Sequence, residues 1–185
     1  PDLSKLEIIQ RRQAPSTNGA SPQEFDRYEM TEDYISPMPL PGKHHQHYVA
    51  TGLEHDEHAY IDYSPEAHIR MTEKRTQKIE PAIEEHDMVR RYGSEEAQLG
   101  LIAWGSSEGP IREAIERAEA KGYKVAALIF KLLSPLPEKA ARAFIESIPI
   151  VSVVELNASG QFANYLQSRL CVPLKRFNIY SGLPF

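Results

Sequence analysis

The second half of the chain alternates between two hydrophobic patterns. Short apolar runs are typical of buried strands, whereas apolar residues that recur every three or four positions are typical of amphipathic helices. The apolar runs predict strands over 99–104, 124–130, 150–155 and 174–180. The periodic segments predict helices that begin near Pro110, near Pro137 and at Gln161. This alternation predicts an α/β fold, a three-layer, mostly parallel sheet with helices on both faces and right-handed crossovers.

The first half of the chain shows no such alternation. Prolines and glycines interrupt residues 25–58, so we expect no long regular element there. A helix is expected over about 65–91, because Ser64 is a good N-cap and Pro65 suits a first helical turn. Its many charges and few apolar residues are typical of a surface or interface helix, and Pro81 should kink or restart it.

These patterns divide the chain into two parts of opposite charge. Residues 1–95 are predicted to form an irregular, partly helical connector, acidic and rich in proline and histidine, and residues 96–185 an α/β domain. The connector has 11 Lys and Arg against 18 Asp and Glu, and the domain has 10 against 8. The net charge of −5 for the whole chain argues against a general nucleic-acid binder.

Composition excludes several further classes of protein. The chain has 185 residues, of which 41% are hydrophobic, so it can bury an ordinary core. The longest apolar run, Val125–Phe130, is too short to cross a membrane, and no signal-peptide pattern occurs, so we expect a cytoplasmic protein. The single cysteine, Cys171, excludes an internal disulfide and a four-cysteine zinc or iron–sulfur site built from this chain alone.

Two features could bind ligands, and each also has a plainer interpretation. The segment Gly105–Gly109 joins a strand to a helix, where backbone amides can bind phosphate, but it matches no nucleotide-binding motif and can serve as a tight turn. Five histidines lie among carboxylates and could bind a divalent metal ion, or could form a polar contact loop. They are His44, His45, His47, His55 and His58. Their spacing fits no zinc motif, so we expect no native metal site.

A third candidate is the segment 155–161, which follows a predicted strand. Ligands of α/β sheets bind at the carboxyl ends of the strands. We favour ordinary turn chemistry for Asn157 and Ser159, since either can cap the next helix. Turn geometry explains Glu155 and Gln161 less easily, so they are candidates for a ligand or subunit contact.

Five segments, in order along the chain, resemble motifs of one protein family. They are Arg27–Pro37 followed by Pro41-Gly42, then Thr51–Glu57, Met71–Lys78, Val154–Gln161 and Tyr180–Phe185. Over about Leu6 to Phe185 the chain resembles the alpha subunit of 2-oxoacid:ferredoxin oxidoreductases, closest to the 2-oxoglutarate type. Tyr34 and Met38 stand where that family usually has Gly and Arg, so we carry over no Arg-mediated contact at Met38.

The resemblance implies a place within a larger enzyme. The chain would be the C-terminal portion of the alpha subunit, ending in a transketolase C-terminal-like domain, with a pyrimidine-binding domain expected before Pro1. The holoenzyme would oxidatively decarboxylate a 2-oxoacid, pass the acyl group to coenzyme A and reduce ferredoxin. Thiamine diphosphate, Mg²⁺ and iron–sulfur clusters would be held by other domains or subunits, including a beta subunit. This portion would be structural and inactive in isolation.

No catalytic residue is carried over by the resemblance. Motif position instead implies contacts with other subunits or near the active site. The candidates are Arg27, Tyr28, Glu54, His55, Glu155, Asn157 and Gln161. Two alternatives stay open: a free-standing α/β module that binds a nucleotide or acyl-carrier group through Gly105–Gly109, and a metal-binding accessory protein built on the histidine loop.

Overall fold

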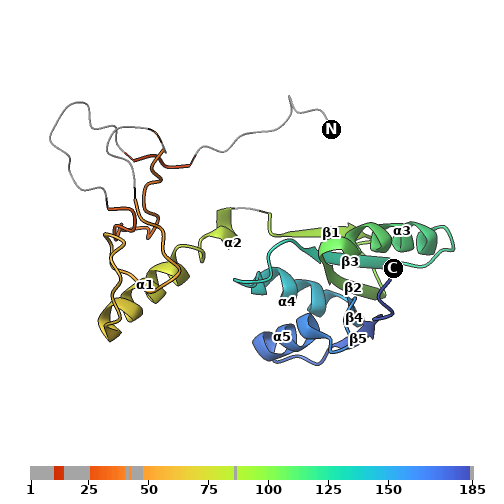
Figure 1. Cartoon of the computed structure of the whole chain (residues 1–185). Helices are drawn as coiled ribbons and strands as arrows, with labels where there is room; N and C mark the ends of the chain where they lie inside the picture. Colours follow the sequence, from red (N-terminus) through yellow and green to blue (C-terminus); the bar gives the residue numbers. More distant parts are fainter. Residues whose placement is uncertain (1–10, 15–25, 41, 43–47, 86, 184–185) are drawn as a thin grey trace. The chain divides into compact units, whose positions relative to one another are not determined.

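The computed structural model describes residues 11–14, 26–40, 42, 48–85 and 87–183 (Figure 1). The chain divides into two compact units, Pro1–Pro81 and Ala82–Phe185. Within the described ranges, no helix is long and apolar enough to cross a membrane.

The second unit is built on a sheet whose strand order, within the described residues, is β1-β3-β2-β4-β5. β1 runs antiparallel to β3, and the other neighbouring strands are parallel. The strands are β1 (Val89–Gly93), β2 (Leu99–Trp104), β3 (Val125–Phe130), β4 (Ile150–Glu155) and β5 (Lys175–Asn178). The helices are α2 (Ala82–Glu85), α3 (Glu108–Glu119), α4 (Glu138–Ser147) and α5 (Gln161–Leu170).

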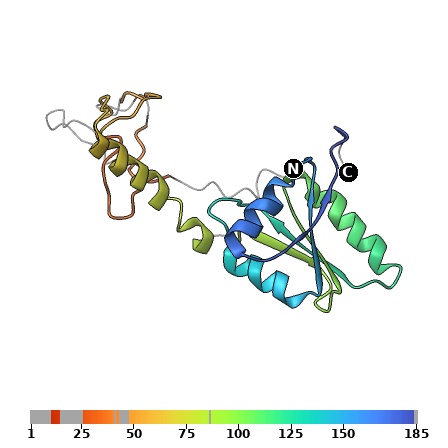
Figure 2. The same ribbon diagram turned by 90° about the horizontal axis from the view of Figure 1, so that it is seen from below.

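Helices lie on both faces of this sheet (Figure 2). α4 and α5 cover one face, and their Phe144 and Leu166 belong to the larger core together with Phe130 of β3. α3 lies on the other face, where its Ile111 and Ile115 form a smaller core with β3 and its neighbours. The predicted fold class, a mostly parallel sheet between two helical layers, is therefore confirmed.

Gly100 allows α4 to approach the sheet closely. A Cβ added at this position in β2 would lie 2.9 Å from a ring carbon of Phe144, closer than carbon atoms pack. The absence of a side chain at this point in the strand therefore sets the distance between β2 and α4.

The first unit is organised around α1 (Pro65–Gln77). Ser64 caps this helix, since its hydroxyl accepts a hydrogen bond of 3.2 Å from the Ala67 amide, and Pro65 occupies the first turn as predicted. Its buried face includes Met71 and Lys74. The described parts of residues 26–63 are irregular, as the proline and glycine pattern predicts.

The stretch expected as one charged helix over about 65–91 is divided in the structure. α1 ends at Gln77, α2 spans only Ala82–Glu85, and Val89–Gly93 forms the edge strand β1. β1 was missed because its Val-Arg-Arg-Tyr-Gly sequence has neither a long apolar run nor a strict alternation. The compact α/β unit accordingly begins at Ala82, whereas the sequence pattern placed the boundary at residue 96.

Candidate functional site

The order of the strands marks one edge of the sheet as a candidate site. β2 continues into α3 on one face, and its neighbour β4 continues into α5 on the other face. In open α/β sheets, ligands bind at the carboxyl ends of two such strands, where the connections diverge. The carboxyl edge between β2 and β4 is therefore the place where this topology favours binding.

Glu155, the last residue of β4, organises one side of this edge. Its side chain is only 1% exposed, and its carboxylate accepts hydrogen bonds from the amides of Phe162 (2.9 Å) and Ala163 (3.0 Å). These amides belong to the first turn of α5, where backbone N–H groups lack partners within the helix. The positive end of the helix dipole also favours a carboxylate here. Glu155 thus caps α5 from the preceding strand.

Asn157 completes the turn between β4 and α5. Its side-chain amide donates to the Glu155 carboxylate (2.9 Å), and its side-chain oxygen accepts from the Gly160 amide (2.7 Å). Gly160 has a φ of 63°, in the left-handed region that favours glycine. The side chain of Gln161, at the start of α5, is exposed. Glu155 and Asn157 therefore build the turn, and Gln161 is accessible to a partner.

Glu108 occupies the other side of the edge, at the start of α3. Its carboxylate accepts hydrogen bonds from the Tyr92 hydroxyl and from Arg90 (3.2 Å). The Tyr92 hydrogen bond, and then the Arg90 interaction, lower the pKa of Glu108. A negative charge held at this helix start repels phosphate, so the structure does not favour the phosphate-binding interpretation of Gly105–Gly109.

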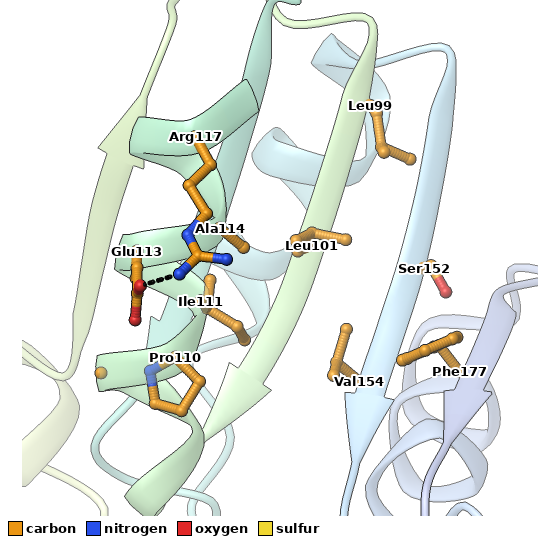
Figure 3. A pocket seen from close by; sticks show the side chains of 11 residues that line it. Leu99, Leu101, Pro110, Ile111, Glu113, Ala114, Arg117, Ser152, Val154 and Phe177 are labelled. Carbon is orange, nitrogen blue, oxygen red and sulfur yellow. Dashed lines mark hydrogen bonds and ion pairs between the residues drawn. The ribbon is translucent and has the colours of Figure 1, made fainter. Parts of the chain in front are cut away.

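An apolar groove of about 800 Å³ runs over the sheet beside α3 (Figure 3). Leu101 of β2, Val154 of β4 and Phe177 of β5 form its floor, and α3 forms one wall. Arg117 and Glu113 pair with each other on that wall. The Phe177 side chain is 55% exposed.

This groove exists because α3 does not cover the whole face of the sheet. α4 and α5 both lie on the opposite face, so among the described residues of the second unit no helix lies over β4 and β5 on the α3 side. Mostly parallel sheets usually have both faces covered, and an exposed apolar area of this kind marks an interaction surface. The sequence pattern did not predict this surface. Apolar residues on both faces of β4 are consistent with it, but they do not show which face each helix covers.

Arg27, Tyr28 and His55 lie together in the first unit. The Tyr28 and His55 rings are 4.0 Å apart between centroids, and the Arg27 guanidinium lies over the Tyr28 ring at 5.1 Å. His55 is buried, and its Nδ1 donates a hydrogen bond of 2.8 Å to the Asp56 carbonyl oxygen. These three predicted candidates therefore form one contiguous group.

Glu54 connects its loop to α1. Its carboxylate accepts two hydrogen bonds from Arg75, of 3.1 and 2.9 Å, and one from His68, of 2.6 Å. These bonds, the Arg75 bonds foremost, lower the pKa of Glu54 to about 2. The four candidates of the connector thus belong to the first unit, whereas Glu155, Asn157 and Gln161 belong to the second.

The histidine cluster is only partly visible. His44, His45 and His47 lie outside the described residues. His58 pairs with Asp26, and His55 is buried beside Tyr28. Within the part of the chain that the structure describes, no three His, Cys, Asp or Glu side chains are grouped to hold a metal ion.

Comparison with known proteins gives consistent matches. A family model described as pyruvate:ferredoxin oxidoreductase core domain II matches residues 97–183. The 2-oxoglutarate:ferredoxin oxidoreductase of Magnetococcus marinus, solved with 2-oxoglutarate, coenzyme A and succinyl-CoA bound, superposes on 100% of this chain with a TM-score of 0.84 and 36% sequence identity. The chain is thus similar over its whole length to members of the 2-oxoacid:ferredoxin oxidoreductase family. The family resemblance seen in the sequence motifs is therefore confirmed.

Curated oxidoreductase alpha subunits agree with this assignment. The 2-oxoacid:ferredoxin oxidoreductase subunit alpha of Saccharolobus solfataricus is 35% identical over 78% of this chain. The 2-oxoglutarate oxidoreductase subunit KorA of Mycobacterium tuberculosis is 32% identical over 100% of it. The chain spans 23% and 27% of these relatives and 32% of the solved M. marinus chain. It thus corresponds to a region of an oxidoreductase alpha subunit.

Proposed function

We propose that this chain is part of the alpha subunit of a thiamine-diphosphate-dependent 2-oxoacid:ferredoxin oxidoreductase. The enzyme oxidatively decarboxylates a 2-oxoacid, transfers the acyl group to coenzyme A and passes the electrons to ferredoxin. The observation that carries this proposal is the agreement with the M. marinus enzyme over the entire chain, at 36% identity. The enzyme works in the cytoplasm.

Within that enzyme, this chain contributes structure and assembly. Thiamine diphosphate and Mg²⁺ are held by other domains or subunits. The iron–sulfur clusters also lie elsewhere, because a cluster needs several cysteine ligands and this sequence has one cysteine. The chain alone is therefore inactive.

The groove beside α3 is the part of this chain that most needs a covering partner. Its floor, formed by Leu101, Val154 and the exposed Phe177, resembles the core of a protein interface more than a free surface. The partner is another part of the oxidoreductase, either the beta subunit or another alpha-subunit domain. Gln161, Arg27 and Tyr28 are further contact candidates.

Two of the relatives indicate 2-oxoglutarate as the substrate of the enzyme that contains this chain. The M. tuberculosis relative is a 2-oxoglutarate oxidoreductase subunit, and the M. marinus enzyme was solved with 2-oxoglutarate bound. We extend that substrate class, a 2-oxoacid with a second carboxylate, to the enzyme that contains this chain.

Co-expression with the products of the neighbouring reading frames tests the assembly. A tagged copy of this chain should co-purify with a beta subunit in a complex of defined mass. Gln161→Ala and Phe177→Asp should each reduce the co-purified amount, while exposed Lys121→Ala, outside the groove, should not. If the parent chain co-purified with no other subunit, the proposed role would be refuted.

A further inference from the structure

Arg27 differs from most arginines of this chain in having no carboxylate partner. Arg12, Arg75, Arg90, Arg91 and Arg117 each pair with an acidic side chain. Arg27 makes no hydrogen bond or ion pair with the described residues, and its Nε is buried without an acceptor. A buried donor without an acceptor is unfavourable, so the Nε–H group of Arg27 is suited to donate a hydrogen bond to an oxygen of a bound ligand.

Two aromatic rings hold the Arg27 guanidinium by its faces. It lies 5.1 Å from the centroid of Tyr28 and 5.4 Å from that of Tyr48. Tyr28 is fixed in turn by the His55 ring and by a backbone hydrogen bond of 3.1 Å from its amide to the Glu57 carbonyl oxygen. A guanidinium held by its faces keeps its N–H donors in the plane of the group, where they match two oxygens of a carboxylate or phosphate.

Lys74 is a second cation without a carboxylate partner in the same unit. Its side chain is 6% exposed, and its ammonium donates to the Glu29 carbonyl oxygen. Burial first, and then the charges of Lys78 and Arg27, lower the pKa of Lys74. A buried ammonium normally has an anionic partner.

The nearby carboxylates do not supply that partner. Glu57 receives the Met30 amide at 3.2 Å and pairs with Arg70 at 3.4 Å. Glu29 and Glu57 raise the pKa of Lys74, yet within the described residues neither forms an ion pair with Lys74 or Arg27.

We propose that Arg27 is the bidentate donor of a binding site for an oxyanion, a carboxylate or phosphate group. Tyr28 and Tyr48 orient the guanidinium, and Lys74 adds a positive charge to the same unit. This site is built entirely from the first unit and does not depend on the proposed oxidoreductase activity.

Titration of the full chain, with arginine side chains labelled for NMR, tests this site. Inorganic phosphate and succinate serve as separate probes, and their relative affinities identify which oxyanion the site prefers. The Arg27 Nε–H signal should shift in a saturable manner with at least one probe. Arg27→Lys keeps the charge but loses the planar fork, so it should weaken binding by about tenfold or more, measured by calorimetry.

Arg112→Gln is the matched control, since Arg112 also lies over a tyrosine ring, Tyr92 at 5.2 Å, but close to the Glu108 carboxylate. Its affinity for both probes should equal that of the parent. No saturable shift with either probe, or equal affinity in the parent and Arg27→Lys, would overturn the proposal.

Discussion

Among the described residues, Glu155 is held by three N–H donors and pairs with no cation. The amides of Phe162 and Ala163 and the side chain of Asn157 surround its carboxylate at 2.9 to 3.0 Å. Turn geometry explained Glu155 less easily at the level of sequence, so it was a candidate for a ligand or subunit contact, whereas in the structure its carboxylate caps α5. The sequence could not show the direction of the side chain, because capping of a helix by the preceding strand leaves no local motif.

Truncation of Glu155 should destabilise the second unit. Glu155→Ala leaves two buried amides and the Asn157 side chain without acceptors, so the free energy of unfolding should fall by about 2–3 kcal/mol. Denaturant unfolding followed by circular dichroism measures this change. Gln161→Ala, six residues along the same turn, should change it by less than about 0.5 kcal/mol, because that side chain is exposed. Equal stability of Glu155→Ala and the parent chain would contradict the assigned role.

Glu54 should make the stability of the first unit depend on pH. Its pKa falls from 4.5 to about 2, with Arg75 as the main cause, so the folded state binds its proton less readily than the unfolded state does. The resulting stability is present above about pH 4.5 and is lost as the pH falls towards 2.

The comparison of Glu54→Gln with the parent chain measures this contribution. The variant should be less stable at neutral pH, and the difference should shrink between pH 4.5 and 2 in denaturant titrations. Arg75→Gln should reduce this pH dependence, since Arg75 supplies the largest interaction that lowers the Glu54 pKa. A difference that stays constant over this range would show that the ion pair does not stabilise the fold.

At the scale of elements, the sequence predicted the regular parts of the second unit because their patterns are local. The apolar runs of β2, β3 and β4 and the amphipathic helices between them need no information from distant residues. β1 depends instead on pairing with β3, and its Arg90 and Arg91 are typical of an edge strand as well as of a charged helix. The groove follows from which face each helix covers, which only the connectivity determines.

Gly100 provides a test of the packing between β2 and α4. Gly100→Ala should lower the free energy of unfolding by about 1–3 kcal/mol, because the new Cβ would meet the Phe144 ring at 2.9 Å. Gly109→Ala is the matched control, since Gly109 lies in α3 with open space around its Cα. It should leave stability unchanged or raise it by up to about 1 kcal/mol. Equal effects of the two substitutions would contradict the close approach.

The open face should matter for assembly and little for folding. Phe177→Asp should change the free energy of unfolding of the isolated chain by less than about 1 kcal/mol, since the side chain is 55% exposed. Leu166→Ala removes a side chain of α5 from the core, and should lower the free energy of unfolding by about 2–5 kcal/mol. In the complex, the order should reverse: Phe177→Asp should weaken subunit association more. A large loss of stability in isolated Phe177→Asp would show that the groove belongs to the fold.

At the scale of the whole molecule, motif order along the sequence identified the family before any geometry was known. One of these motifs, the Glu155–Gln161 turn, combines a special backbone requirement with fixed polar contacts. The motifs could not reveal the partner surface, since the groove residues are ordinary apolar strand positions. The chain therefore consists of an α/β unit with one partly uncovered face and a connector organised around α1, and it spans about a third of the solved M. marinus relative.

The measurement that tests this account most directly is turnover by the co-purified complex. The assay follows reduction of a ferredoxin or viologen acceptor on addition of 2-oxoglutarate and coenzyme A under anaerobic conditions. We predict reduction that requires both compounds, no reduction by this chain alone, and a loss of turnover in complexes that lack this chain. Turnover by the isolated chain, or full activity of the other subunits without it, would contradict the account.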